Sequence, residues 1–180
     1  QQAMTAATGD VKLSLAPLRL GAGGVQPDAV LPALGRLAAK SGTVNGEAAL
    51  AWDEAGPRGA ARVGFDGVSV EDADSGLAVD GLSGAIDFDS LAPLATPPGQ
   101  TLRVARLDGG VALGDVRLDF QLLPDRAGQP AVVLEAFEAG FAGGKLAARG
   151  GRVAASGDTA LSLAVAGVEL GSLLGDVGAE

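Results

Sequence analysis

Closely spaced carboxylates are the residues whose type and spacing could do chemistry in this chain. Asp87 and Asp89 are two residues apart, and Asp115 and Asp119 are four apart. Paired carboxylates can act as general acid and base or hold a divalent cation. In a strand, residues at these spacings project from one face. A water-facing sheet surface explains both pairs without any reaction, and we favour that interpretation.

Missing residue types remove most other chemistry. The 180 residues include no His, no Cys and no Tyr, so a thiolate nucleophile, a Ser-His-Asp triad and the usual zinc or haem ligands are excluded. Lys12, Lys40 and Lys145 are isolated, and no Ser-x-x-Lys occurs. The glycine-rich segments 21–24 and 141–144 lack the GxxxxGK[ST] motif of phosphate-binding loops. We therefore expect no enzyme, no metal and no cofactor.

The amino-acid composition excludes further functional classes of protein. Thirteen Lys and Arg oppose 22 Asp and Glu, which gives a net charge of −9. Nucleic-acid binding needs a basic surface, so that class is excluded. The chain is 47% hydrophobic but only 3% aromatic, so a core would be built from Ala, Val and Leu. No apolar run reaches the roughly 18 to 20 residues of a membrane-spanning helix. The ends, QQAMTAATG and SLLGDVGAE, suggest an excised segment of a longer protein.

Alternating apolar and polar residues dominate the chain, which is typical of strands with one apolar face. The clearest alternating runs are residues 11–15, 43–52, 61–65, 116–122 and 161–165. Turn sequences that combine Gly with Asp, Pro or Ser lie at 54–59, 74–76, 108–110, 125–128 and 156–158. Such spacing predicts roughly ten strands joined by short hairpin turns.

One stretch predicts an amphipathic helix, near residues 32–40. Asp28 can cap it, Leu34 and Leu37 would share its apolar side, and Ser41-Gly42 would end it. We expect this helix to pack against the sheet. A second short helical start is predicted at 171–174. The chain then divides into a leading strand with the helix (1–42) and a curved sheet (43–180).

The segment 82–125, LSGAIDFDSLAPLATPPGQTLRVARLDGGVALGDVRLDFQLLPD, resembles the YdbH-like family, a branch of the AsmA-like bridge proteins of the Gram-negative envelope. The family is also labelled "dicarboxylate transport". Its most specific pieces here are TPPGQ (96–100), LDGGVAL (107–113) and FAGG (141–144). Upstream, LPALGRLAAKSGTVNGEAALAW (31–52) is similar to the family's helix and glycine-spaced strand. The resemblance covers about residues 30–175.

The resemblance implies a mainly β fold, a strongly curved, mostly antiparallel sheet shaped like a folded taco. Its inner surface would be a hydrophobic groove that carries phospholipids between the inner and outer membranes. The implied location is the periplasm, in a protein anchored to the inner membrane by an N-terminal helix outside this chain. The implied partners are phospholipid acyl chains and, at the sheet edges, the remainder of the same protein. The residues expected to line the groove are Leu50, Trp52, Val63, Phe65, Val116, Leu118, Phe120, Leu122, Leu161, Leu163 and Val165.

Two other interpretations stay open at this stage. A structural or adhesion-type β-domain with a closed core would use the same apolar residues as packing. Composition alone favours packing in a closed core, whereas the family resemblance favours groove lining for the same residues. A dicarboxylate-binding role is less favoured, because no clustered Arg offers bidentate pairing. Trp52 fits either an acyl-chain contact or a plug at a strand end. Unpaired sheet edges would let the isolated segment form homo-oligomers.

Overall fold

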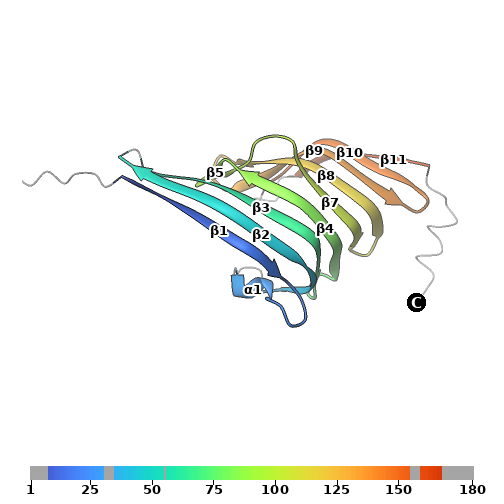
Figure 1. The fold of residues 1–180 in the computed structure, drawn as a ribbon. Coiled ribbons are helices and arrows are strands. Elements are labelled where there is room, and N and C mark those ends of the chain that lie inside the picture. Colours follow the sequence, from blue (N-terminus) through green and yellow to red (C-terminus); the bar gives the residue numbers. More distant parts are fainter. Residues whose placement is uncertain (1–7, 31–34, 55, 155–158, 168–180) are drawn as a thin grey trace, which may run out of the picture.

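The structure is a computed structural model that describes residues 8–30, 35–54, 56–154 and 159–167. It is one open antiparallel sheet in which each strand pairs with the next along the chain (Figure 1). The strands of this sheet are β1 (Gly9–Arg19), β2 (Leu37–Asp53), β3 (Gly56–Asp72), β4 (Leu77–Phe88), β7 (Gln100–Asp108), β8 (Ala112–Pro124), β9 (Pro130–Phe141), β10 (Gly144–Ala154) and β11 (Thr159–Ala166). Between β4 and β7, β5 (Ser90–Leu91) and β6 (Leu94–Ala95) pair only with each other.

The mainly β, antiparallel class predicted from sequence is confirmed. All five alternating runs lie inside strands, namely β1, β2, β3, β8 and β11. The turn sequences at 74–76, 108–110 and 125–128 fall at or beside the connections between strands. Connections this short join neighbouring antiparallel strands, so the sheet is a simple meander.

The helix predicted near 32–40 is wrong where the structure describes that stretch. Leu37–Lys40 begin β2, and Ala39 pairs with Val70 of β3. The side chain of Gln26 also accepts the Ala39 N–H (3.0 Å). Sheet pairing therefore overrides a local helical pattern. A four-residue helix, α1 (Pro27–Val30), precedes it.

Residues 31–34 and the helical start at 171–174 lie outside the described residues. The division at residue 42 stays an interpretation of the sequence, and β2 continues across that position.

The strand register gathers apolar residues on one side of the sheet. Directly opposed residues in antiparallel strands project from the same face, and successive pairs link all nine strands. The linked pairs are Val11–Leu50, Gly46–Val63, Val63–Ile86, Gly84–Leu102, Leu102–Leu118, Leu118–Phe137, Phe137–Ala148 and Leu146–Val165. We call this side the apolar face. It carries Val11, Leu13, Leu15, Leu50, Trp52, Val63, Phe65, Leu82, Ile86, Phe88, Leu102, Val104, Val116, Leu118, Phe120, Leu122, Val132, Leu134, Phe137, Leu146, Val153 and Val165.

The opposite side, the charged face, carries Lys12, Glu47, Arg62, Asp87, Arg103, Arg117, Asp119, Glu138, Lys145 and Arg152. Within the described strands, the charged residues whose register matches the apolar face are Asp72, the last residue of β3, Asp80 near the start of β4, and Arg106 and Asp108 at the end of β7. Asp72 accepts the Asp74 N–H (3.0 Å) and pairs with Arg36 (3.4 Å), so it closes the turn after β3.

Register shifts mark β-bulges that bend the strands. Gly42 in β2 (φ 115°), Gly67 in β3 (φ 57°) and Asp115 in β8 (φ 48°) lie at such shifts. A positive φ is easy for glycine and strained for other residues. The strands arch in Figure 1.

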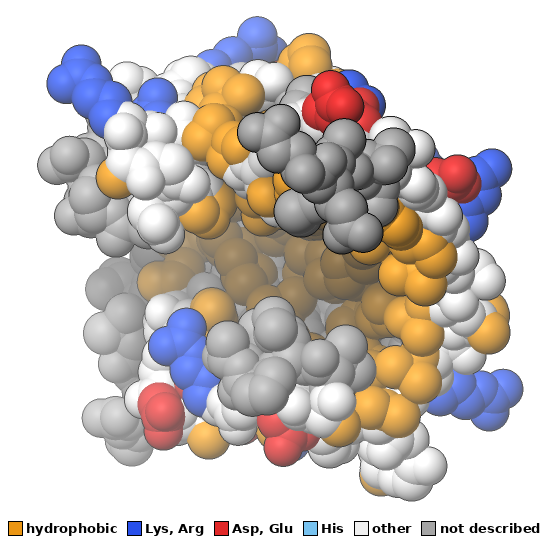
Figure 2. Space-filling model, turned by 90° about the vertical axis from the view of Figure 1, so that its left-hand side faces the viewer, with side chains coloured by type: hydrophobic (Ala, Val, Ile, Leu, Met, Phe, Trp, Pro, Cys, Tyr) orange, Lys and Arg blue, Asp and Glu red, His pale blue; other side chains and the backbone are white. Residues whose placement is uncertain are grey.

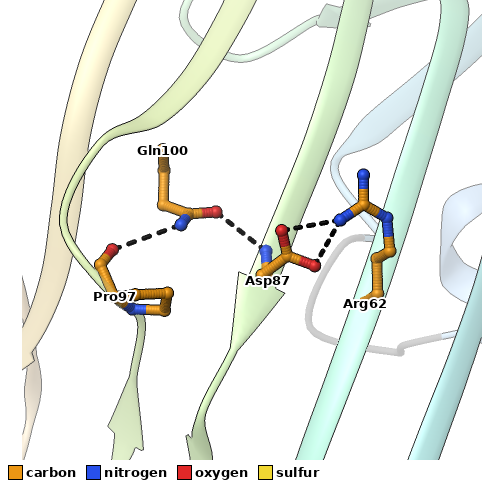
Figure 3. A network of polar contacts seen from close by, with 4 residues as sticks. All are labelled: Arg62, Asp87, Pro97 and Gln100. Carbon is orange, nitrogen blue, oxygen red and sulfur yellow. Dashed lines mark hydrogen bonds and ion pairs between the residues drawn. The ribbon is translucent and has the colours of Figure 1, made fainter.

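The TPPGQ segment (96–100) completes the hydrogen bonding where β7 begins. Thr96 donates its N–H to the Leu122 carbonyl (3.0 Å), and its Oγ1 accepts the Leu122 N–H (2.9 Å). On the other side, Gln100 Oε1 accepts the Asp87 N–H (2.8 Å), and Gln100 Nε2 donates to the Pro97 carbonyl (3.2 Å) (Figure 3). Thr96 is 1% exposed and Gln100 6%. The segment with the strongest family resemblance therefore satisfies backbone groups that β7 leaves unpaired.

Gly42→Ala should destabilise the sheet by more than about 2 kcal/mol, because strained φ and a clash combine. A Cβ at Gly42 would lie 2.4 Å from Val68 Cα, whereas nothing lies within 4 Å of a Cβ at Gly67. Gly67→Ala is the matched control and should lose only about 1 kcal/mol, the cost of the left-handed backbone. Urea unfolding measures both. Equal losses would show that the close approach at Gly42 is unimportant.

Thr96→Val should lower the unfolding free energy by about 1–3 kcal/mol, because the buried Leu122 N–H loses its acceptor. Thr96→Ser keeps the hydroxyl and should recover most of that loss. The same urea titrations compare the two variants. If Ser and Val behave alike, the hydroxyl contributes nothing at this position.

Candidate functional site

The apolar face is buried at its centre and open at the N-terminal side. Phe120 of β8 is 4% exposed, whereas Leu13 of β1 is 54% exposed and Trp52 of β2 is 41% exposed. Figure 2 looks at the molecule from that side and shows hydrophobic side chains around a hollow. Contiguous exposed apolar surface of this kind marks an interaction or ligand-binding site.

The predicted lining residues fall on this one face. Leu50, Val63, Phe65, Leu118 and Leu122 are half-buried, Val116 and Phe120 are buried, and Trp52 and Val165 are exposed. The backbone register places Leu161 opposite Gly151 and Leu163 opposite Ala148, but the side chains of these two leucines lie outside the described part of the structure.

Sequence reasoning missed the contribution of β4 and β7 to this face. Leu82, Ile86 and Phe88 come from β4, and Leu102 and Val104 from β7. For β4, the sequence feature that could have indicated these residues is the apolar alternation in LSGAIDF (82–88), which Gly84 interrupts. In the structure Gly84 lies opposite Leu102, so this gap in the apolar series is still a position on the apolar face.

Small residues hollow the apolar face at β1–β3. A depression of about 370 Å³ is lined there mainly by Leu13, Leu15, Gly46, Ala48, Ala61 and Val63. Gly46 lies directly between Leu15 and Val63 in the register and leaves the space that a larger side chain would fill. The volume of this depression falls within the range of roughly 300–1,000 Å³ typical of small-molecule sites.

One carboxylate of each pair singled out in the sequence forms an ion pair on the charged face. Asp87 pairs with Arg62 (2.6 Å) (Figure 3), and Asp119 pairs with Arg117 (3.1 Å). The pKa of Asp119 lies below its ordinary value, chiefly because the Thr101 hydroxyl donates a hydrogen bond and also because Arg117 is near, although burial opposes the shift. A general acid needs a raised pKa, so Asp119 is not suited to that role. Among the described residues, no three His, Cys, Asp or Glu side chains gather as a metal site.

The chain was compared with protein families, curated proteins and solved structures. The family model "YdbH-like: Intermembrane phospholipid transport protein YdbH" matches residues 1–180. No curated protein and no solved structure matches. Within the described residues, no helix has the length and apolar character needed to cross a membrane. The matching family is one of lipid transport proteins rather than enzymes. Because the family model covers the full chain, this protein belongs to the YdbH-like family of intermembrane phospholipid transport proteins.

Proposed function

We propose that the chain is a non-enzymatic segment of a periplasmic bridge protein and that it carries phospholipids between the inner and outer membranes. The acyl chains would move along the apolar face. One observation supports this most directly. Across the nine described strands, the charged residues whose register matches this face lie only near the turn-side ends of β3, β4 and β7, and the apolar side chains are exposed at β1 and β2.

The energetics of lipid transfer require such a surface. Each methylene that leaves the bilayer for water loses about 0.8 kcal/mol, so a two-tailed lipid needs an apolar path throughout. A buried charge on that path would oppose passage by several kcal/mol. Nine strands about 4.8 Å apart give a path of roughly 40 Å. That length exceeds the roughly 30 Å hydrocarbon core of a bilayer, yet it is only part of a bridge between two membranes.

The face supports binding by the tails alone. In the described strands, the one Lys or Arg at its register positions is Arg106 near the end of β7, and that side chain is paired with Asp108 (2.9 Å). The head group would therefore stay in water while the acyl chains contact the sheet. No bond forms or breaks in this mechanism, and no residue acts as a catalyst.

The sheet edges bear on the proposed partners. β1 and β11 each pair with one neighbour only within the described sheet. An edge strand keeps unpaired backbone groups on its free side. We propose that the remainder of the same protein covers these edges, and that a second copy does so when the segment is isolated.

The alternatives have less support. A closed structural core would bury Leu13, Leu15 and Trp52, all of which are exposed in an open sheet. A dicarboxylate site would need free cations. Arg62, Arg106 and Arg117 are each paired with an aspartate of the same chain, which disfavours them as ligands for a dianion.

Leu13→Asp should abolish phospholipid transfer while leaving the chain folded, because the charge enters the proposed path at an exposed position. Ser14→Asp is the matched control, since it adds the same charge at the next residue, on the opposite face. Transfer of a fluorescent phospholipid between vesicles and the urea midpoint measure the two effects. Equal transfer by the two folded variants would contradict the proposed path.

A further inference from the structure

The β5–β6 hairpin lies in the connection between β4 and β7, which pair directly with each other; β5 is labelled in Figure 1. It is closed by the Asp89 N–H, which donates to the Ala95 carbonyl (3.2 Å), and by pairing of Leu91 with Leu94. β5 contacts β3, whereas β6 contacts β8. The hairpin therefore reaches strands on both sides of the β4–β7 pair.

The β8 end of the hairpin is fixed by polar contacts. The Thr96 backbone and hydroxyl both bond Leu122, and Gln121 Nε2 donates to the Thr96 carbonyl (3.0 Å). The Gly99 N–H donates to Glu135 of β9 (3.1 Å). Thr96 and Gln100 are also nearly fully buried, so residues 96–100 form a hydrogen-bonded base.

The β3 end is held differently. The side chain of Leu91 lies over Gly59, whose missing side chain makes the space: a Cβ there would lie 3.0 Å from Leu91 Cδ1 and 2.7 Å from Leu50 Cδ2. Gly59 pairs with Leu50, so Leu91 rests on the apolar face. Among the described residues, no hydrogen bond joins residues 90–95 to β3.

We propose that the β5–β6 hairpin is a hinged cover over the apolar face, with 96–100 as its base and Leu91 as its free end. When it lifts, Leu91 leaves the notch at Gly59 and an acyl chain takes its place beside Leu50. This inference rests on the proposed function, because it requires an apolar ligand on that face. Among the described residues, Leu91 meets β3 through apolar contact at Gly59, and a hydrocarbon chain can replace that contact.

The cover can be locked by a disulfide. The chain contains no cysteine, so Gly59→Cys with Leu91→Cys offers a single intramolecular bridge. A Cβ at residue 59 would lie 3.4 Å from Leu91 Cγ, which is close enough for the two sulfurs to meet. The probe is phosphatidylcholine with a nitrobenzoxadiazole group on one acyl chain. Oxidation should slow its uptake and release at least fivefold, and reduction should restore both rates. Equal rates in the two states would overturn the cover.

Two further measurements separate this inference from the proposed function. Leu91→Ala shortens the contact and should speed release of the probe, whereas an unchanged rate would count against Leu91 as the latch. In the lipid-free chain, hydrogen exchange should be faster at residues 90–95 than at Gln100 and Leu122. Uniformly slow exchange would overturn the hinge. If the probe binds no form of the protein, the proposed function falls, and exchange still decides whether the hairpin moves.

Discussion

The register of the antiparallel pairing is the constraint on which the rest of this structure depends. A slip by one residue would turn every side chain of a strand to the other face. Here such a slip would bring Arg117 and Asp119 onto the side that now holds Val116, Leu118 and Phe120. The bulges at Gly42, Gly67 and Asp115 change the local pairing, and the charged residues that share the register of the apolar face lie near the turn-side ends of β3, β4 and β7. Curvature and segregation of charge are therefore compatible in one chain.

An open sheet must also satisfy its own strand ends. The side-chain amide of Gln26 hydrogen-bonds to both the N–H and the carbonyl of Ala39. The side-chain oxygen of Gln100 likewise accepts the N–H of Asp87. Thr96 completes β8. Unpaired buried backbone groups are costly, so these side chains allow strands of unequal length to lie side by side. The same contacts fix the base of the β5–β6 hairpin beside the apolar face.

Strands with an unbroken alternation were predictable from the sequence, as Val116–Leu122 illustrates. The apolar residues of β4 and β7 were not recognised, because Gly84 interrupts one series and Arg103 and Arg106 flank the other. The error at Leu37–Lys40 has a different origin. The spacing of Leu34 and Leu37 fits a helix, whereas the pairing with β3 that decides the outcome involves residues more than thirty positions away. Long-range pairing is not encoded in local periodicity.

The candidate site was predictable in its chemistry but not in its shape. Leu50, Val63 and Leu118 were recognisable as one kind of strand position, and the register brings them to one face. The gradient from buried Phe120 to exposed Leu13 depends on how the sheet bends and where it stays open. The contact between Leu91 and Gly59 joins two segments that no sequence pattern links.

Native mass spectrometry of the purified chain, with extraction and identification of any bound lipid, tests the central claim most directly. The account predicts phospholipid bound in a defined stoichiometry and held through its acyl chains. A stable, folded chain that carries no lipid, and takes up none from phospholipid vesicles, would contradict it.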